Sequence, residues 1–319
     1  MSARSATNRK NDAIARNTAA PAKRDSTSGC AKTASTIASP AGKRAISRHS
    51  TEASGHRFIR TPVHPTSSNA IRKYYLSFLR RWGPQNWWPA ESRFEVIVGA
   101  YLTQNTAWGN VEKAIAGLRS AGMLSVKSIR EAALPELEQA VRSSGYFRQK
   151  AWRLKNFVEF LDSKYAGSLD RMLAQPTEKL RTELLGLNGV GPETADSILL
   201  YAGDHPVLVV DAYTRRILER HGVIYSKTGY EEIRALMEQA ISGAKPEALT
   251  VSRPGAEPRH AASRISAKQR SPLAQHYNEL HALIVRTGNQ HCRKTPHCEG
   301  CPLQRFLPEH SSRSAGNRR

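Results

Sequence analysis

Asp211 is a candidate catalytic carboxylate because of its position between an apolar run and a predicted helix. It follows a short apolar run, VLVV at 207–210, and precedes an amphipathic stretch that begins AYTRRILERHG. An Asp at such a junction is well suited to be the N-cap of the helix that follows. The same position would keep the carboxylate ionised and aimed, and a partly buried anion of this kind is suited to catalysis.

One segment, 180–203, has the pattern of a phosphate-binding hairpin. Two apolar helical stretches flank the tight loop LNGVG at 187–191, and Pro192 stands where the second helix would begin. The paired glycines of this loop let the backbone approach a ligand closely, and the N–H groups at the helix start form an anion site. Val190 is expected to point inward. The alternative is an ordinary turn between packed helices.

Three of the four cysteines, Cys292, Cys298 and Cys301, fall within ten residues. Such clustering is typical of a metal or cluster site in a reducing compartment rather than of a disulfide framework. Zinc bound by three cysteines and one histidine fits these spacings. The nearby histidines that could complete such a site are His291, His297 and His310. A loop that binds no metal is the alternative.

Helical periodicity dominates the chain from Ile71 onward. The first stripe, from Ile71 to Trp82, has apolar residues at helical spacing. Similar stripes cover further stretches at about 93–107, 110–120, 126–143, 149–165, 178–186, 192–203, 212–221, 229–242 and 272–286. Only VLVV at 207–210 resembles a strand, and it is short enough to be a buried connector. The sequence therefore predicts an all-α fold.

Three segments lack this periodicity. Residues 1–68 are rich in Ser, Thr, Ala, Lys and Arg, and we expect a disordered basic tail whose composition also resembles that of an organelle transit peptide. Residues 243–270 are rich in Pro, Ser, Ala and Arg and predict a disordered insertion between two helices. Residues 307–319 predict a second loose tail.

The chain of 319 residues carries a formal net charge of +21. Residues 1–60 contribute +9 and the remainder +12, so the folded part is basic without its tail. Such a balance favours polyanions as partners, nucleic acid above all, although solubility alone would also explain it. No apolar run reaches the roughly 20 residues that span a bilayer, and the N-terminus lacks the apolar core of a secretory signal.

The ordered chain, from about 71 to 306, resembles the endonuclease III superfamily of helix-hairpin-helix DNA glycosylases. The resemblance rests on the hairpin, the Gly/Pro-rich loop after it and the Asp that follows, here Asp211. It implies two helical domains, with DNA and the active-site cleft between them. A six-helix domain with the hairpin would span 93–207, and 71–92 plus 208–306 would form the second domain, which ends in the Cys-rich loop.

The resemblance also implies the chemistry. A damaged nucleotide is flipped from the duplex, and its N-glycosidic bond breaks through an oxocarbenium-like state. An ionised Asp211 would stabilise that cation and position or activate water. The hairpin would hold a DNA phosphate, and Gln104 would fill the gap left by the flipped base. The residues expected to contact DNA are Gln104, Leu187, Gly189, Val190, Gly191 and Thr194.

Glu193 departs from the pattern of the bifunctional members. These carry, two residues after the last glycine of the hairpin, a Lys whose amine forms a Schiff base with the sugar. A carboxylate cannot form an imine, so lyase activity should be absent or weak. We therefore expect a monofunctional glycosylase that leaves an abasic site. Glu193 would contact the extruded base or simply start the helix, where acidic residues are favoured.

Trp87, Trp88 and Trp108 resemble the pocket aromatics of the branch that removes alkylated purines such as 3-methyladenine. A cationic methylated purine stacks well on an indole ring. Tryptophans that belong to the core or lie between domains are the alternative. Oxidised pyrimidines remain the second substrate class.

Superfamily members often bind a [4Fe–4S] cluster through the pattern C-x6-C-x2-C-x5-C near the C-terminus. Here five residues separate Cys292 from Cys298, and Cys301 follows with the expected spacing. Leu307 stands where the fourth cysteine is expected. The ligand set is incomplete, since such a cluster normally takes four thiolates. Three thiolates could bind one with an outside fourth ligand, such as His291, His297 or His310.

The leading hypothesis is a monofunctional DNA glycosylase of base-excision repair that acts as a monomer on damaged duplex DNA. One alternative is an endonuclease III-like glycosylase with lyase activity on oxidised pyrimidines. Another is a non-catalytic helix-hairpin-helix DNA-binding protein, whereas a transcription factor is disfavoured because no recognition helix is evident. We expect a cytoplasmic, nucleoid-associated enzyme, unless the N-terminal segment directs it to an organelle.

Overall fold

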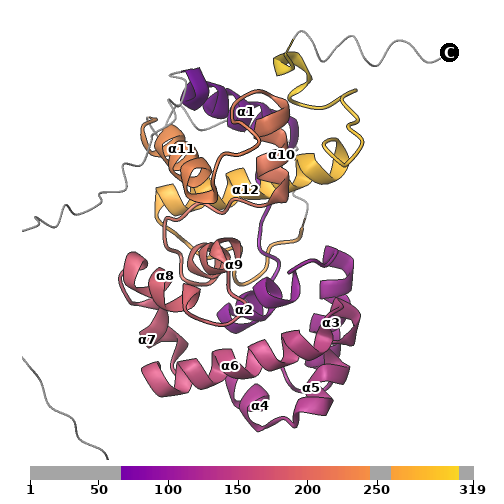
Figure 1. Cartoon of the computed structure of the whole chain (residues 1–319), viewed down its shortest axis with the longest axis vertical. Helices are drawn as coiled ribbons and strands as arrows, with labels where there is room; N and C mark the ends of the chain where they lie inside the picture. Colours follow the sequence, from indigo (N-terminus) through magenta and orange to yellow (C-terminus); the bar gives the residue numbers. More distant parts are fainter. Residues whose placement is uncertain (1–65, 245–259, 309–319) are drawn as a thin grey trace, which may run out of the picture. The chain divides into compact units, whose positions relative to one another are not determined.

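The computed structural model describes residues 66–244 and 260–308, which belong to one compact unit (Figure 1). Within these residues the chain is helical, and the β-type pairing is limited to an isolated bridge between Cys292 and Pro296. The all-α fold class is therefore confirmed. Most of the two expected terminal tails lies outside the described residues.

One group of helices packs around a shared core (Figure 1). It combines the first described helix with helices from the second half of the chain. Its members are α1 (Thr66–Trp82), α10 (Ala212–Arg220), α11 (Tyr230–Ser242) and α12 (Pro272–Gln290). The apolar stripe expected near the start of the chain is the buried face of α1, where Ile71, Tyr75 and Phe78 are each 1% exposed.

A second group contains the helices that lie between α1 and α10 in the chain. Its members are α2 (Arg93–Leu102), α3 (Trp108–Ser120), α4 (Val126–Glu131), α5 (Leu134–Ala140), η1 (Arg142–Ser144), α6 (Phe147–Tyr165), α7 (Leu169–Leu173), α8 (Thr177–Leu185), α9 (Pro192–Ser197) and η2 (Ile198–Ala202). Every residue of α2 from Phe94 to Leu102 is buried, as is typical of a helix at the centre of a core. The two groups meet where α12 packs against η2. A short turn, η4 (Gln304–Phe306), follows α12.

The helix expected over 126–143 is broken into α4, α5 and η1. Pro135 explains the break, because a proline inside a helix lacks the N–H of the helical ladder and its ring clashes with a preceding carbonyl. The backbone of Ala132 and Ala133 is accordingly extended, with ψ angles of 138° and 142°. Helix α5 then starts anew with Pro135 in its first turn, where proline is tolerated.

The expected hairpin lies between α8 and α9. Helix α9 continues directly into η2, a π-helical turn, so the second helix of the hairpin runs from Pro192 to Ala202. Gly189 has a φ of +79°, a left-handed conformation that favours glycine. Val190 is 7% exposed and thus points inward, as expected.

Residues 207–210 form a buried connector that pairs with no strand within the described residues. Side chains accept from two of its backbone N–H groups. The N–H of Leu208 donates to Glu238 Oε1 (2.9 Å), and the N–H of Val210 donates to the hydroxyl of Tyr230 (3.3 Å). The connector thereby places Asp211 at the N-terminus of α10.

The insertion expected over 243–270 is ordered in its last part, 260–270, which corrects the expectation of disorder there. The preceding residues, up to 259, lie outside the described chain. Ser263 Oγ donates to the backbone carbonyl of Trp88 (3.1 Å), and Ile265 is 7% exposed. Polar contacts hold much of this segment in place. Because such contacts do not depend on apolar residues, the low hydrophobicity of the segment suggested disorder.

Candidate active site

A cavity of about 1470 Å³ lies where the two groups of helices meet. The loop between α2 and α3 lines it together with residues of α6, α9, α10 and α12. Asp211, Glu193 and Trp108 all face this space, as does Gly191 of the hairpin. The candidate carboxylate and the hairpin therefore share one cavity.

Asp211 is the N-cap of α10, as the sequence predicts. Its Oδ1 accepts hydrogen bonds from the backbone N–H (2.7 Å) and the hydroxyl (2.8 Å) of Thr214. Burial raises the pKa of this carboxyl, but His281 and the bonds from Thr214 outweigh that effect, so the pKa of Asp211 lies below its ordinary value. The carboxylate is thus ionised at neutral pH.

Glu193 lies in the first turn of α9, and its exposed surface faces the cavity. The carboxyl is therefore accessible to a ligand while protein atoms crowd around it. This crowding and the nearby charge of Asp211 raise the pKa of Glu193 to about 6, while His281 acts in the opposite direction. Glu193 is consequently anionic at neutral pH and becomes neutral in mild acid.

Gln104 ties the α2–α3 loop to the hairpin. Its Nε2 donates to the carbonyl of Gly189 (2.8 Å) and to Thr194 Oγ1 (2.9 Å). Its Oε1 accepts from Arg153 Nη1 (2.7 Å). Gln104 therefore lies beside the hairpin, and its amide is engaged by protein groups.

The two glycines of the hairpin have different surroundings. A Cβ at Gly189 would lie 2.1 Å from Arg153 Nε and would require that side chain to move, whereas a Cβ at Gly191 would meet nothing within 4 Å. The N-terminus of α9 is thus open toward the cavity. Of the residues expected to contact DNA, the cavity wall includes Gln104, Gly191 and Thr194, and the turn beside it contains Leu187, Gly189 and Val190.

The tryptophans expected at the base pocket form one aromatic cluster. The ring centroid of Trp108 lies 5.3 Å from that of Trp87 and 5.2 Å from that of Trp88. Trp87 and Trp88 are 6% and 5% exposed, so most of each ring belongs to the core, and the half-buried Trp108 offers the more accessible ring. The cluster is therefore both part of the core and one wall of the cavity.

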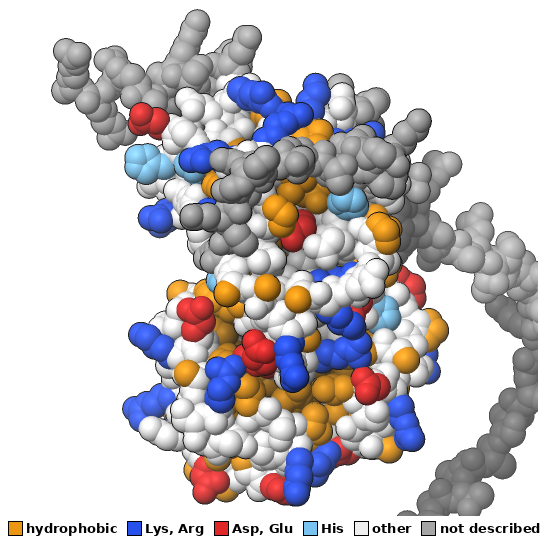
Figure 2. Space-filling view, turned by 180° about the vertical axis from the view of Figure 1, so that it is seen from behind, with side chains coloured by type: hydrophobic (Ala, Val, Ile, Leu, Met, Phe, Trp, Pro, Cys, Tyr) orange, Lys and Arg blue, Asp and Glu red, His pale blue; other side chains and the backbone are white. Residues whose placement is uncertain are grey.

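Cations outnumber anions around the cavity. Its basic side chains are Lys150, Arg153, Arg216, Arg293 and Lys294, and its carboxylates are Glu193 and Asp211. On the face drawn in Figure 2, Lys and Arg side chains are instead interspersed with Asp and Glu. The excess of positive charge beside the hairpin fits the phosphate backbone of DNA.

Residues 98–242 match the HhH-GPD superfamily of base excision DNA repair proteins. The chain is also 41% identical over 238 residues to MJ1434 of Methanocaldococcus jannaschii, named as a DNA repair glycosylase, with 74% of this chain and 94% of that one aligned. The chain belongs to the HhH-GPD superfamily. Endonuclease III of Thermotoga maritima is 31% identical to this HhH-GPD protein over 156 residues, which are 49% of this chain and 67% of that one.

Solved structures share the fold of this HhH-GPD protein. The 3-methyladenine DNA glycosylase MagIII of H. pylori, bound to 1,N6-ethenoadenine, is 28% identical, with a TM-score of 0.55 over 70% of this chain and 97% of that one. A non-covalent endonuclease III–DNA complex has a TM-score of 0.58 over 78% of this chain and 98% of that one, at 21% identity, and shows similarity of fold alone. The predicted resemblance to the endonuclease III superfamily is thereby confirmed, and the chain is a DNA glycosylase of base-excision repair.

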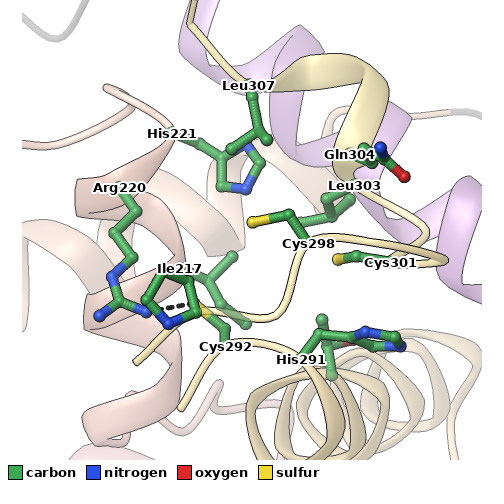
Figure 3. Close-up of a pocket in the computed structure, with 12 residues that line it drawn as sticks. Ile217, Arg220, His221, His291, Cys292, Cys298, Cys301, Leu303, Gln304 and Leu307 are labelled. Carbon is green, nitrogen blue, oxygen red and sulfur yellow. Dashed lines mark hydrogen bonds between the residues drawn. The ribbon is translucent and has the colours of Figure 1, made fainter. Parts of the chain in front are cut away.

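In this HhH-GPD glycosylase the clustered cysteines line a separate cavity of about 390 Å³ (Figure 3). Cys292 is buried, and Cys298 and Cys301 are partly exposed. Leu307 lines the same cavity and stands at the place of the fourth cysteine, with His221 beside it in the close-up.

Arginines of α10 close the loop that carries the cysteines. Arg220 Nη1 donates to Cys292 Sγ (3.2 Å) and to the carbonyl of Arg293 (2.7 Å). Arg220 Nη2 donates to the carbonyl of Lys294 (2.8 Å), and Arg216 Nη1 donates to the carbonyl of Cys292 (3.0 Å). The loop is therefore held to α10 by direct protein contacts.

The residues around this cavity do not fit a four-thiolate cluster. Leu307, which stands where the fourth thiolate of such a cluster is expected, offers no ligand atom. Across residues 66–244 and 260–308, no group of three or more His, Cys, Asp or Glu side chains is arranged to hold a metal ion. His310, one of the histidines considered as a further ligand, lies outside the described residues.

His281 and Tyr201 are residues of the site that sequence reasoning missed. His281, on α12, lines the cavity, and the ring of Tyr201 packs against Trp88 with centroids 5.1 Å apart. Both lie on buried helix faces. Periodicity could have placed them in the core, but only the packing of α12 against η2 brings them together beside Asp211.

Proposed function

We propose that this protein is a monofunctional DNA glycosylase that releases alkylated purines from duplex DNA. The observation that carries the proposal is the shared cavity of Asp211, Glu193 and Trp108 beside the hairpin. Such a cavity combines an ionised carboxylate for the sugar with an anionic and aromatic wall for the base. MagIII, a 3-methyladenine DNA glycosylase, supports the proposal through its similar sequence and fold.

Asp211 acts on the sugar of the flipped nucleotide. The bond between C1′ and the base nitrogen breaks, and its electron pair leaves with the base. The ionised carboxylate of Asp211 stabilises the positive charge that develops on the sugar. Water then adds to C1′ and loses a proton to solvent, which leaves an abasic site and the free base.

Glu193 is the reason for proposing that no lyase step follows. It occupies the hairpin position from which an amine would attack the sugar, and a carboxylate cannot form an imine. Lys150 also lines the cavity, but its Nζ donates to the carbonyls of Leu102 (2.9 Å) and Ser144 (2.6 Å) and to Thr106 Oγ1 (2.6 Å). All of its N–H groups are therefore committed to holding the α2–α3 loop.

The charge and the rings of the cavity favour an alkylated purine. A purine methylated on a ring nitrogen carries a positive charge, which is attracted both to an indole face and to a carboxylate. Trp108 and the anionic Glu193 supply these two groups. An oxidised pyrimidine is neutral and gains less from either of them.

We also propose that the C-terminal loop of this glycosylase closes without a four-thiolate cluster. The support is the aliphatic side chain of Leu307 at the fourth ligand position, together with the hydrogen bonds of Arg220 to the loop. These bonds supply the closure that a shared metal cluster would otherwise give.

Release of bases from two kinds of damaged duplex tests the function. The protein is incubated with methylated DNA and with oxidised DNA, and the freed bases are identified by mass spectrometry. We expect methylated purines from the first duplex and no release from the second. Release of oxidised pyrimidines alone would support an endonuclease III-like substrate range instead, and binding without release from either duplex would support a non-catalytic DNA-binding protein.

A further inference from the structure

His281 is buried in α12 and faces the carboxylate of Asp211. It is 6% exposed, and its Nε2 lies 3.7 Å from Asp211 Oδ2. This separation is within ion-pair range but longer than a hydrogen bond. Nε2 has no hydrogen-bond partner in the part of the chain that the structure describes, whereas buried polar atoms are normally bonded. Within the described residues, the ring therefore has a polar atom without a hydrogen bond, Nε2, beside the carboxylate of Asp211.

Tyr201, in η2, engages the other nitrogen of the ring. Its hydroxyl is hydrogen-bonded to Nδ1 of His281. Burial, together with the charges of Asp211 and Glu279, raises the pKa of Tyr201 well above its usual value, so the hydroxyl keeps its proton. When that hydroxyl donates to Nδ1, a neutral imidazole carries its own proton on Nε2. The N–H then lies on the side of Asp211.

The two oxygens of Asp211 have different surroundings. Oδ1 accepts two hydrogen bonds from Thr214 and is fixed to the first turn of α10. Oδ2 is the oxygen that lies near His281 of α12. Helices from both sides of the carboxylate therefore act on its orientation.

Ionisable groups reach His281 from several of the elements around it. Asp211 comes from the N-terminus of α10, and Glu193 comes from α9. Tyr230, on α11, lines the same cavity. Glu279 on α12 and Arg270 before it act on Tyr201, the bonded partner of the ring. Two carboxylates thus lie near His281, so a hydrogen-bond donor on their side is favourable.

We propose that His281 is a positioning residue of this glycosylase, which donates from Nε2 to Oδ2 of Asp211 as the cationic sugar forms. The hydrogen bond holds the carboxylate ionised and aimed at C1′. The inference rests on the proposed function, because it requires Asp211 to be the catalytic carboxylate. His281 contacts Asp211 and acts through it rather than on the substrate.

A set of variants separates this role from simple packing. His281→Leu removes the donor, and His281→Gln places an amide N–H near the position of Nε2. The matched control is His276→Gln, because His276 lies on the same helix, also pairs with a tyrosine hydroxyl (Tyr75, 3.1 Å) and does not line the cavity. Single-turnover rates of base release from methylated duplex are measured from acid to neutral pH. Thermal unfolding and affinity for abasic duplex are measured alongside.

The expected results differ between the variants. His281→Leu lowers the maximal rate by about tenfold and moves the acid limb of the pH–rate profile up by about one pH unit, because Asp211 loses a partner that lowers its pKa. His281→Gln recovers most of the rate, since the donor is restored. His276→Gln follows the wild-type profile.

A rate and pH profile of His281→Leu equal to those of the wild type would overturn the inference. If that variant fails to fold, Tyr201→Phe decides instead, because it removes only the hydroxyl that orients the ring. An unchanged pH profile in Tyr201→Phe would then reject the positioning role. The proposed function fails separately, namely if the wild type releases no base or if Asp211→Asn is fully active.

Discussion

The backbone N–H and the hydroxyl of Thr214 both donate to the same oxygen of Asp211, at 2.7 and 2.8 Å. One carboxylate oxygen is thereby committed to capping α10, and the other is left beside the cavity. The helix cap and the proposed catalytic role are thus served by different atoms of one side chain. The cap fixes the direction in which the second oxygen points.

Thr214→Val should impair this arrangement without removing it. The variant keeps the backbone bond but loses the hydroxyl that helps to lower the pKa of Asp211, so the acid limb of the pH–rate profile should move to higher pH. The free energy of unfolding should fall by about 1 kcal/mol through loss of a buried hydrogen bond. Thr214→Ser, which keeps the hydroxyl, is the matched control and should resemble the wild type. A valine variant with an unchanged pH profile and stability would show that the hydroxyl has no such role.

Glu193 should make recognition of a cationic base dependent on pH. The pKa of Glu193 is raised to about 6, so the carboxyl is neutral in mild acid and anionic above that pH. The value of kcat/KM for a methylated purine should therefore increase as pH rises through about 6. Glu193→Gln, whose side chain is neutral at every pH, should have a lower kcat/KM that changes less with pH in this range. Profiles of equal shape for the two proteins would argue against a charge interaction with the base.

The DNA strand should remain intact after base release. Because Glu193 stands at the hairpin position of a Schiff-base lysine, the abasic product should break only on treatment with alkali. Denaturing gels run with and without alkali measure this directly. Borohydride provides the control, since it traps an imine between protein and sugar. A trapped adduct would contradict the monofunctional assignment and would direct attention to the lysines of the cavity.

Arg220→Ala should loosen the cysteine-bearing loop. The variant loses hydrogen bonds to Cys292 and to two backbone carbonyls, so the free energy of unfolding should fall by about 2 kcal/mol, and thiol reagents should label Cys298 and Cys301 faster. Cys301→Ser should leave stability nearly unchanged if the loop closes without a cluster, as proposed. Iron analysis of anaerobically purified protein is the decisive control. About four iron atoms per chain would contradict closure of the loop by protein contacts alone.

Local signals explain what could be predicted from the sequence. Asp211 was recognisable as an N-cap because the residue type and the apolar run before it define the helix start. The hairpin followed from a glycine pair and a proline at fixed spacing. The break in the helix after residue 131 was missed, although Pro135 was a local signal for it.

Tertiary contacts explain what could not be predicted. His281 and Tyr201 are separated by 80 positions and meet only through the packing of α12 on η2. Residues 260–270 are ordered partly by polar contacts such as that of Ser263 with Trp88, which composition does not reveal. The hydrogen bond to Cys292 in the cysteine-bearing loop comes from Arg220, a residue of another helix.

The most direct measurement is base release by Asp211→Asn from methylated duplex DNA. The substitution keeps the shape of the side chain and removes its charge, so release should be lost while affinity for abasic DNA is largely retained. Asp170→Asn is the matched control, because that aspartate is 89% exposed and lies outside the cavity. A control as active as the wild type beside an inactive Asp211→Asn is the result we predict. Full activity of Asp211→Asn would contradict the assignment of Asp211 as the catalytic carboxylate.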